Sequence, residues 1–450
     1  MLNKVKQRIR DDWKLFLQNY WLDRKPIYTP DDPQWHNEGL SFAFISIILI
    51  GMTLFFSPMP PDDLLRHVHA WQYGYDYRLM FDGYPYHFNA WYGFDWVAGN
   101  LYQAFGAFSI KLIQTASIAL LALVVYLNLH EAHKDTRIFL LLFVIWAVGD
   151  RFLLARPTIF ETLLMFLAIA ASYKNLKPQW DALLHLTLGC LMASFYHLFF
   201  IYLIPLLFWR RIYLFPLLAG VIGWQWFSGG QYFQEVMDIF NFGSMRIDGI
   251  NVTENRFALP AILLLGAFAL LFVYHWQRTD KQWLLTAGWF SLPMQIRYVM
   301  DNLFPILIFI LGRHWKIRPH PFLILFMLVM VKGTLGSSAF YFSQKPQTTE
   351  YFAQGEHILA QNLGVNFWVI NQGANQQVRV APAMEIGFAD NAIQQATLEK
   401  KVSCELLRKF DFDKYVENSA VELPTECLQL QASTADGYKI WKVLHNDFVR

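Results

Sequence analysis

One short stretch of the chain carries residues whose types and spacing suit acid–base chemistry. Its sequence, PPDDLLRHVHAW over 60–71, sets Asp62 and Asp63 directly after two prolines. Proline suits the first helical position and carboxylates suit the positive end of a helix dipole, so a helix is expected to begin here. The i, i+4 spacing then pairs Asp62 with Arg66 and Asp63 with His67 on one face. An aspartate placed there could act as a general base, although helix capping alone would also explain the pair.

Further arginines could supply fixed positive charge beside such a base. Arg156 occurs in LLARPTIFE and Arg297 in QIRYVMDN, and with Arg66 they are the candidates for binding a phosphate as it leaves a sugar. A divalent metal held by Asp62 and Asp63 is the alternative source of positive charge. Arg297 could also be an arginine that snorkels from a helix end. Together these groups suit transfer of a sugar from a lipid phosphate to an acceptor hydroxyl.

A second group of side chains could contact the substrate. Its members follow the acidic pair or lie in later loops, and they are His67, Trp71, Glu161, His197 and Tyr298. Trp71 could stack on a sugar face, although an aromatic anchor in a membrane interface is the commoner role. Glu161 could simply neutralise Arg156, and His197 could be a satisfied histidine at a helix junction. The hypothesis of a site therefore depends on these groups lying on one side of the molecule.

The composition of the chain indicates which elements must position these groups. Of the 450 residues, 55% are hydrophobic and only 16% are charged, which is too apolar for a typical soluble protein of this length. The sequence therefore predicts an α-helical polytopic membrane protein with about eleven spans, forming a transmembrane domain over 36–335 with a catalytic first outer loop over 58–105. The segments expected to form the spans are 40–57, 106–128, 138–150, 158–173, 181–196, 197–208, 212–227, 258–274, 282–297, 303–312 and 320–336.

The distribution of Lys and Arg predicts the orientation of these spans. Residues 1–35 are basic, and their apolar side chains follow one helical stripe, so an interfacial amphipathic helix is expected there. Alternate loops carry basic pairs, such as Lys174 with Lys177 and Arg210 with Arg211. Because basic loops stay inside, the N-terminus is predicted to be cytoplasmic. The stretch around Asp62 would then lie on the periplasmic face.

The composition shifts toward polar residues at about position 336. GANQQVRVAPAMEIG and GYKIWKVL have the pattern of strands, and 336–450 is predicted to be a small soluble α+β domain on the periplasmic side. Cys404 and Cys427 both lie in this region. A disulfide between them is expected in an oxidising compartment, with two free thiols as the alternative.

With these features together, the chain resembles the GT-C superfamily of integral membrane glycosyltransferases. The resemblance rests on PPDDLLRHVHAWQ in the first outer loop, on LLARPTIFE, on two short spans that meet at Tyr196-His197, and on Arg297-Tyr298. It implies an enzyme of the bacterial inner membrane that takes a sugar from a polyprenyl-phosphate-linked donor and passes it to a protein, lipid or glycan acceptor. It also implies that a first-loop aspartate is the base and that basic outer-face residues bind the lipid phosphate. Pilin-modifying and envelope-glycan-modifying enzymes are members of similar size.

Two other functions stay open at this point. A multispan transporter or flippase of lipids or sugars would also combine many spans with charged residues, but it should show an internal repeat, and none is found. A non-catalytic scaffold for an envelope assembly is the second alternative. Membrane lipids are expected partners of so apolar a chain. A net charge of +2 gives no reason to expect a nucleic-acid partner.

Overall fold

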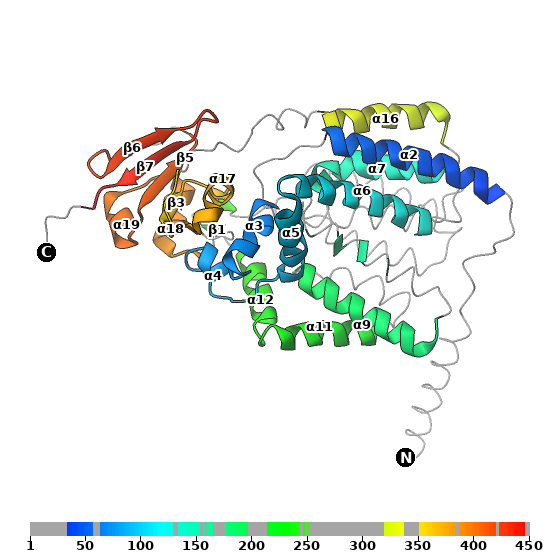
Figure 1. The fold of residues 1–450 in the computed structure, drawn as a ribbon, viewed down its shortest axis with the longest axis horizontal. Helices are drawn as coiled ribbons and strands as arrows, with labels where there is room; N and C mark the ends of the chain where they lie inside the picture. Colours follow the sequence, from blue (N-terminus) through cyan, green and yellow to red (C-terminus); the bar gives the residue numbers. More distant parts are fainter. Residues whose placement is uncertain are drawn as a thin grey trace, which may run out of the picture.

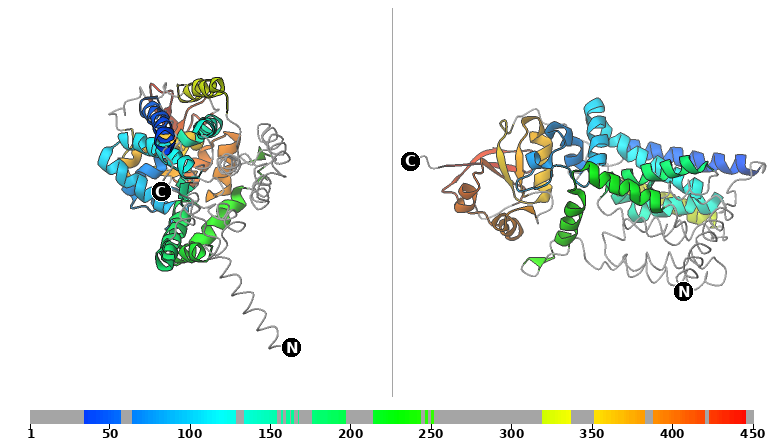
Figure 2. Two further views of the ribbon diagram at one scale, coloured as in Figure 1. Left: turned by 90° about the vertical axis from the view of Figure 1, so that its right-hand side faces the viewer. Right: turned by 90° about the horizontal axis from the view of Figure 1, so that it is seen from below.

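The computed structural model joins a helical bundle to a unit built on a β-sheet, with short helices between them (Figure 1). The right-hand view of Figure 2, from below, shows the same separation of the bundle and the sheet along the long axis. The structure describes residues 34–56, 64–128, 134–153, 157, 160–161, 163–164, 167, 176–196, 214–243, 246–247, 250–251, 319–336, 351–382, 388–419 and 423–445.

The bundle contains two groups of packed helices. α2 (Gln34–Phe56), α6 (Phe108–Asn128), α7 (Lys134–Leu153) and α16 (Pro321–Gly336) contact one another. α9 (Pro178–Phe195) and α11 (Leu214–Phe227) form a second, closely packed pair. These helices coincide with apolar segments of the sequence, because an uninterrupted run of Leu, Ile, Phe and Ala both favours helix and supplies the surface that helices bury against one another.

Two glycines allow α9 and α11 to approach so closely. A Cβ atom added to Gly189 would lie 2.1 Å from the carbonyl oxygen of Leu217, and one added to Gly220 would lie 2.1 Å from that of Leu186. Any larger residue would collide with the backbone of the neighbouring helix. The pair is therefore held by direct backbone contact, and α9 in turn packs against α5.

The prediction of a polytopic membrane protein is wrong. Among the residues that the structure describes, no helix combines the length and the apolar character needed to span a membrane. α11 and α16 have 14 and 16 residues, fewer than the roughly 20 that cross a bilayer, whereas α2, α6 and α7 have 23, 21 and 20. The prediction took apolar runs of the sequence as spans, although most of these runs are shorter than about 20 residues. The predicted transmembrane domain, its cytoplasmic and periplasmic ends and the multi-pass location in an inner membrane are contradicted by the same finding.

Large apolar side chains are not confined to the core of the bundle. Several are well exposed on the outer faces of three helices: Phe44 and Ile47 on α2, Phe215, Ile222 and Trp226 on α11, and Phe322, Leu325 and Val329 on α16. The inner faces of α6 and α7 are buried, as Leu121, Val125, Leu141 and Val144 show. The high hydrophobic content of the sequence is thus shared between the core and the surface.

Short helices link the bundle to the sheet. They are α3 (Leu64–His69), the 3₁₀ helix η1 (Ala70–Tyr73), α4 (Tyr77–Met80), α5 (Tyr92–Phe105) and α12 (Tyr232–Gly243), the last followed by a hairpin of β1 (Arg246–Ile247) and β2 (Ile250–Asn251). Gly74 ends η1 in the left-handed region, at φ 61°. The Asp76 carboxylate then accepts a hydrogen bond from the Arg78 N–H and caps α4.

The sheet has five strands in the order β4-β3-β5-β7-β6. β3 (His357–Ala360), β4 (Arg379–Ala381) and β5 (Lys414–Glu417) are parallel, and β7 (Lys439–Val443) and β6 (Leu428–Ser433) add an antiparallel edge. The connecting helices are α17 (Leu363–Gly373), which continues into the 3₁₀ helix η5 (Ala374–Gln376), α18 (Asn391–Glu399) and α19 (Cys404–Lys409). Helices alternate with the parallel strands, so the unit is a mixed α/β sheet and not the segregated α+β arrangement that was predicted.

Cys404 and Cys427 form a disulfide with their Cα atoms 5.8 Å apart. This is the pairing that the sequence predicts. It ties the start of α19 to the residue before β6, 23 positions further along the chain. Cys190, the remaining cysteine, is a half-buried free thiol.

The sheet packs directly on the segment that follows α3. The Tyr73 hydroxyl donates a 2.9 Å hydrogen bond to the carbonyl of Val378, and the Asp82 N–H donates one of 2.9 Å to the carbonyl of Val380. Arg379 also forms an ion pair with Asp82. Because apolar residues of both parts belong to one buried cluster, the sheet fixes the position of the segment on which the predicted site lies.

Candidate functional site

The predicted site residues that the structure describes are concentrated on α3. Arg66 and His67 are both buried, with exposed fractions of 2% and 0%. The acidic pair Asp62 and Asp63 lies just before α3, outside the described residues. The other predicted residues outside them are Arg156, His197, Arg297 and Tyr298. The geometry around α3 therefore defines the candidate site.

His67 is oriented by a chain of hydrogen bonds that reaches α5. Its Nδ1 contacts a carboxylate oxygen of Asp95, which is also fully buried. The side-chain Nδ2 of Asn89 donates a 2.9 Å hydrogen bond to the other oxygen of Asp95, and the side-chain Oδ1 of Asn89 accepts one of 2.8 Å from the backbone N–H of Trp91. Because a carboxylate can only accept, this contact places the proton on Nδ1. The same contact fixes the orientation of the imidazole ring.

Arg66 lies between aromatic rings beside this chain. Its guanidinium carbon is 4.5 Å from the centre of the Trp91 ring and 5.9 Å from that of Tyr77. The negative face of an aromatic ring attracts a guanidinium, and the attraction grows when water is excluded. The Tyr77 hydroxyl is in turn 3.4 Å from Nδ1 of His67. Arg66 is thus a buried positive charge held in a fixed place next to His67.

Glu235 brings a second carboxyl group to this region from α12. Its Oε1 accepts hydrogen bonds from the Tyr84 hydroxyl and, at 2.8 Å, from the Ala90 N–H, while Oε2 has no partner among the described residues. Burial raises the pKa of Glu235 to about 8, and the charge of Asp95 acts in the same direction, against the two hydrogen bonds and Arg66. Glu235 is therefore mostly a neutral carboxylic acid at pH 7.

Glu161, predicted to contact the substrate, is completely buried. Neither of its carboxyl oxygens has a hydrogen-bond partner in the part of the chain that the structure describes, and burial raises its pKa far above the usual range. Tyr232 on α12 lies within electrostatic reach of both Glu161 and Glu235. Glu161 thus belongs to the same buried polar region as the groups around α3.

Trp71 is half-buried and faces α5. A Cβ atom added to Gly99 would lie 3.2 Å from Cβ of Trp71, so the absence of a side chain at Gly99 makes room for the tryptophan. The indole N–H of Trp71 has no acceptor among the described residues. Trp71 therefore packs η1 against α5. Its ring makes no direct contact with Arg66 or His67.

A second polar group, formed by buried Asp76 with the exposed side chains Arg78 and His87, lies in the same segment. The Asp76 carboxylate accepts hydrogen bonds from the Arg78 guanidinium, at 2.6 Å, and from Nδ1 of His87, at 2.9 Å. These three side chains cap and brace the turn around α4. Within the described residues, no group of three or more His, Cys, Asp or Glu side chains is placed to hold a metal ion.

The sequence did not single out Asp95, Asn89, Tyr84 or Glu235. Their partners lie far away in the chain: Asp95 is 28 positions from His67, and Glu235 is 151 positions from Tyr84. Asp95 is the one charged residue of α5, but this does not identify its partner, and α12 also carries Asp238, so Glu235 does not stand out in the sequence. Comparison with protein-family models, with curated proteins and with solved structures finds no match for this chain.

Proposed function

We propose that this chain is a glycosyltransferase that moves a sugar from a polyprenyl-phosphate-linked donor to a hydroxyl group of a protein or glycan acceptor. One observation carries the proposal: directly after the Asp62-Asp63 pair in the sequence, α3 buries His67 against Asp95 and Arg66 within electrostatic reach of Glu235. An acidic pair, a fixed cation and an oriented imidazole, which lie within six consecutive residues of the sequence, are the groups that this reaction requires.

The reaction forms a bond between the acceptor oxygen and the anomeric carbon of the sugar, and it breaks the bond from that carbon to the phosphate oxygen. Asp62 or Asp63 takes the proton of the acceptor hydroxyl as the bond forms. The phosphate leaves with the bonding electron pair as an anion, so it requires no proton of its own. It requires positive charge nearby, and Arg66 is the buried cation closest to the acidic pair in the sequence.

The neutral state of Glu235 favours this role of Arg66. An ionised Glu235 would compete with the phosphate for the guanidinium, whereas a protonated carboxyl group does not. Asp95 is occupied by His67 and Asn89. Arg66 is buried beside Trp91, and a positive charge in a water-poor environment stabilises a developing anion more strongly than it would in water. A divalent metal at Asp62 and Asp63 would supply further positive charge and stays a prediction.

The test is a transfer assay with the full-length protein. The donors are polyprenyl phosphates that carry radiolabelled glucose, mannose or arabinose, and the acceptors are an envelope protein and glycan extract. Asp62→Asn and Asp63→Asn keep the size and the capping ability of the side chain but remove the proton acceptor. We expect the variant of the true base to lose about 10²–10⁴ in rate with unchanged stability.

Asp76→Asn is the matched control, because Asp76 lies in the same segment but its carboxylate is paired with Arg78 and His87. It should retain transfer. Arg66→Lys keeps the charge but loses the planar group that lies over Trp91, and it should weaken use of the donor. Full transfer by both aspartate variants would refute the assignment of the base. A wild-type protein that transfers none of the three sugars would refute the enzymatic function tested.

A further inference from the structure

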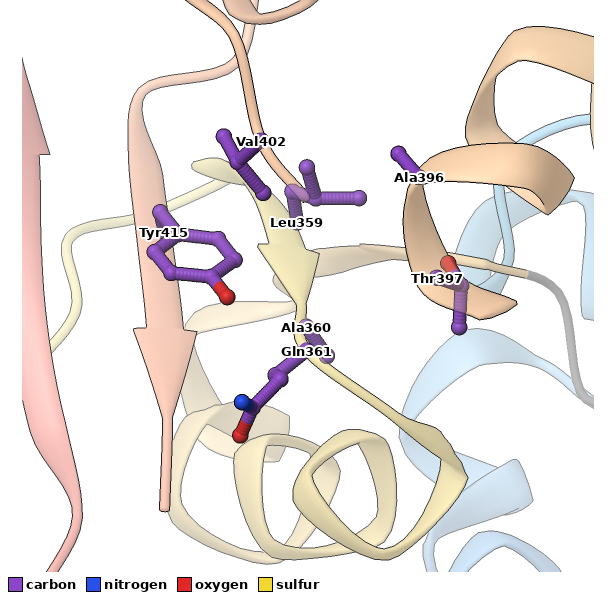
Figure 3. Close-up of a pocket in the computed structure, with 7 residues that line it drawn as sticks. All are labelled: Leu359, Ala360, Gln361, Ala396, Thr397, Val402 and Tyr415. Carbon is purple, nitrogen blue, oxygen red and sulfur yellow. The ribbon is translucent and has the colours of Figure 1, made fainter. Parts of the chain in front are cut away.

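Buried polar atoms without partners among the described residues occur both in the sheet unit and near the candidate site. In the sheet unit, Tyr415 has such a hydroxyl group and lines a hollow between β3, β5 and α18 (Figure 3). This hollow has no room for a water molecule, so it is not a binding site. On α12, Glu235 has such an oxygen in Oε2, while its Oε1 is hydrogen-bonded to the loop before α5. Because that loop continues into the candidate site, the contacts of Glu235 can act on the site.

One face of α12 holds the loop that precedes α5. Glu235 and Asp238 are three positions apart on the helix, so both lie on this face. Oε1 of Glu235 accepts hydrogen bonds from the Tyr84 hydroxyl and, at 2.8 Å, from the Ala90 N–H. Asp238 accepts one from the Tyr86 hydroxyl. The helix therefore fixes the loop through two carboxyl groups, and Glu235 is the one that contacts Ala90.

Ala90 is the second residue of a tight turn. The Tyr92 N–H donates a 3.1 Å hydrogen bond to the backbone carbonyl of Asn89, and Trp91 has φ −118° and ψ 14°. These features are typical of a type I turn, in which Ala90 occupies position i+1. The Trp91 N–H also donates to the side-chain Oδ1 of Asn89, at 2.8 Å. The turn is thus a compact unit, and the contact between Ala90 and Glu235 connects it to α12.

The turn presents one side chain to each basic group of the site. Nδ2 of Asn89 donates a 2.9 Å hydrogen bond to Asp95, and Asp95 contacts Nδ1 of His67. The ring centre of Trp91 lies 4.5 Å from the guanidinium carbon of Arg66. All five side chains are buried. In so closely packed a region, a shift of the turn would be passed on to both basic groups.

We propose that Glu235 is a positioning residue of the candidate site. By holding the turn, it orients both His67 and Arg66. The contact needs an oxygen that accepts hydrogen bonds and needs no negative charge, so glutamine should serve as well as glutamate. As a contribution to sugar transfer this role rests on the proposed function, whereas the orientation of His67 can be measured without any substrate.

The test follows the imidazole proton of His67 by NMR in the full-length protein, with isotope-labelled histidine. His67→Gln identifies the signal by its loss. In the wild type the proton on Nδ1 is held by Asp95, so it should exchange slowly with water. Glu235→Met keeps the length of the side chain but has no acceptor oxygen, and it should make this exchange about tenfold faster, the effect of one lost hydrogen bond. Glu235→Gln should restore the wild-type rate.

Asp238→Leu is the matched control. It removes an acceptor from the same face of α12, but one that holds Tyr86 and not the turn. The exchange of the His67 proton should stay at the wild-type rate in this variant, even if its melting temperature falls. A tenfold faster exchange in Asp238→Leu as well would show that any loosening of α12 reaches His67, and would overturn the specific role of Glu235.

A double variant tests the path from Glu235 to the site. Asn89→Ala removes the link from the turn to Asp95 and should speed the exchange as Glu235→Met does. Because both changes break the same path, the double variant should be no faster than Asn89→Ala alone. Additive effects would mean that Glu235 acts only on general stability, and they would overturn the proposal, as would a wild-type rate in Glu235→Met.

Ala90→Pro takes the place of Glu235→Met if that variant does not fold. Proline suits position i+1 of a type I turn and removes the N–H that Glu235 accepts from, so the exchange should again become faster. An unchanged rate would count against the proposal in the same way. A wild-type protein that transfers no sugar would refute the proposed function, but the exchange rates would still decide whether Glu235 orients His67.

Discussion

The backbone N–H of Ala90 donates a 2.8 Å hydrogen bond to the carboxyl group of Glu235, and so connects the loop before α5 to α12. Tyr84 donates to the same oxygen. The contact fixes one side of the candidate site, and it also buries a carboxyl group whose protonation depends on folding. Glu235 therefore links the pH of the solution to the stability of this region.

Glu235→Gln should make the stability of the protein less dependent on pH. The pKa of Glu235 is raised from 4.5 to about 8 by folding, so the folded state binds more protons than the unfolded state between these values. The free energy of unfolding must then fall as pH rises through this window. Glutamine is always neutral and can still accept from Tyr84 and Ala90. Urea unfolding at intervals from pH 5 to pH 9 measures the slope.

In this experiment the control is Asp238→Asn, also on α12, which accepts a hydrogen bond from Tyr86 in the wild type. It should keep the wild-type slope. If the pH dependence of the unfolding free energy is the same in Glu235→Gln as in the wild type, Glu235 is ionised in the folded protein at neutral pH and its pKa is not raised.

Asp95→Asn should destabilise the protein by about 1–3 kcal/mol. Both neighbours of the Asp95 carboxylate donate, namely the His67 imidazole and the Asn89 amide. An amide at position 95 would have to face one of these donors with its own NH₂ group. The free energy of unfolding from urea titration measures the loss.

The double variant Asn89→Asp with Asp95→Asn separates the two contacts. It restores a donor and an acceptor between positions 89 and 95, but it does not restore the carboxylate beside His67. We expect partial recovery of stability. Complete recovery would mean that the contact with His67 contributes nothing.

Gly220→Ala should destabilise the α9–α11 pair. The new Cβ atom would lie 2.1 Å from the carbonyl oxygen of Leu186, which is backbone and can move only if the helices separate. Overpacking of this kind costs about 1–3 kcal/mol. Gly223→Ala, on the same helix, places its Cβ atom where nothing lies within 4 Å. It should be neutral or slightly stabilising, because alanine favours helix over glycine. Equal melting temperatures for the two variants would contradict the packing described for α9 and α11.

The disulfide between Cys404 and Cys427 should contribute about 3 kcal/mol to the stability of the sheet unit, as expected for a crosslink that closes a loop of this length. The two residues are 23 positions apart. Paired Ser substitutions should lower the midpoint of urea unfolding measured on the full chain. Peptide mapping without reduction should recover the two cysteine peptides joined, with Cys190 alkylated. Free alkylation of Cys404 and Cys427 in the untreated protein would contradict the crosslink.

Local features of the sequence determined where several helices form and where the chain changes from apolar helices to a region that contains strands. Apolar runs gave the positions of α2, α6, α7, α9, α11 and α16 within a few residues. The alternating pattern after residue 336 indicated strands, and the two cysteines of that region are the ones that pair. Helix propensity and strand alternation act over short stretches of the chain, so local sequence is enough to predict these elements. The disulfide could be predicted because both cysteines lie in the same region and therefore in the same compartment.

Tertiary structure alone decided how these elements meet. The apolar runs were interpreted as membrane spans, and the helices that they form in the described residues do not meet the requirements of a span. Arg66 and His67 could be singled out from their place beside Asp62 and Asp63, but Asp95 and Glu235 could not, since their contacts cross long stretches of chain. The order β4-β3-β5 likewise depends on which face each connecting helix covers. Local sequence sets the conformation of a segment, whereas burial and hydrogen bonding between distant segments set its partners.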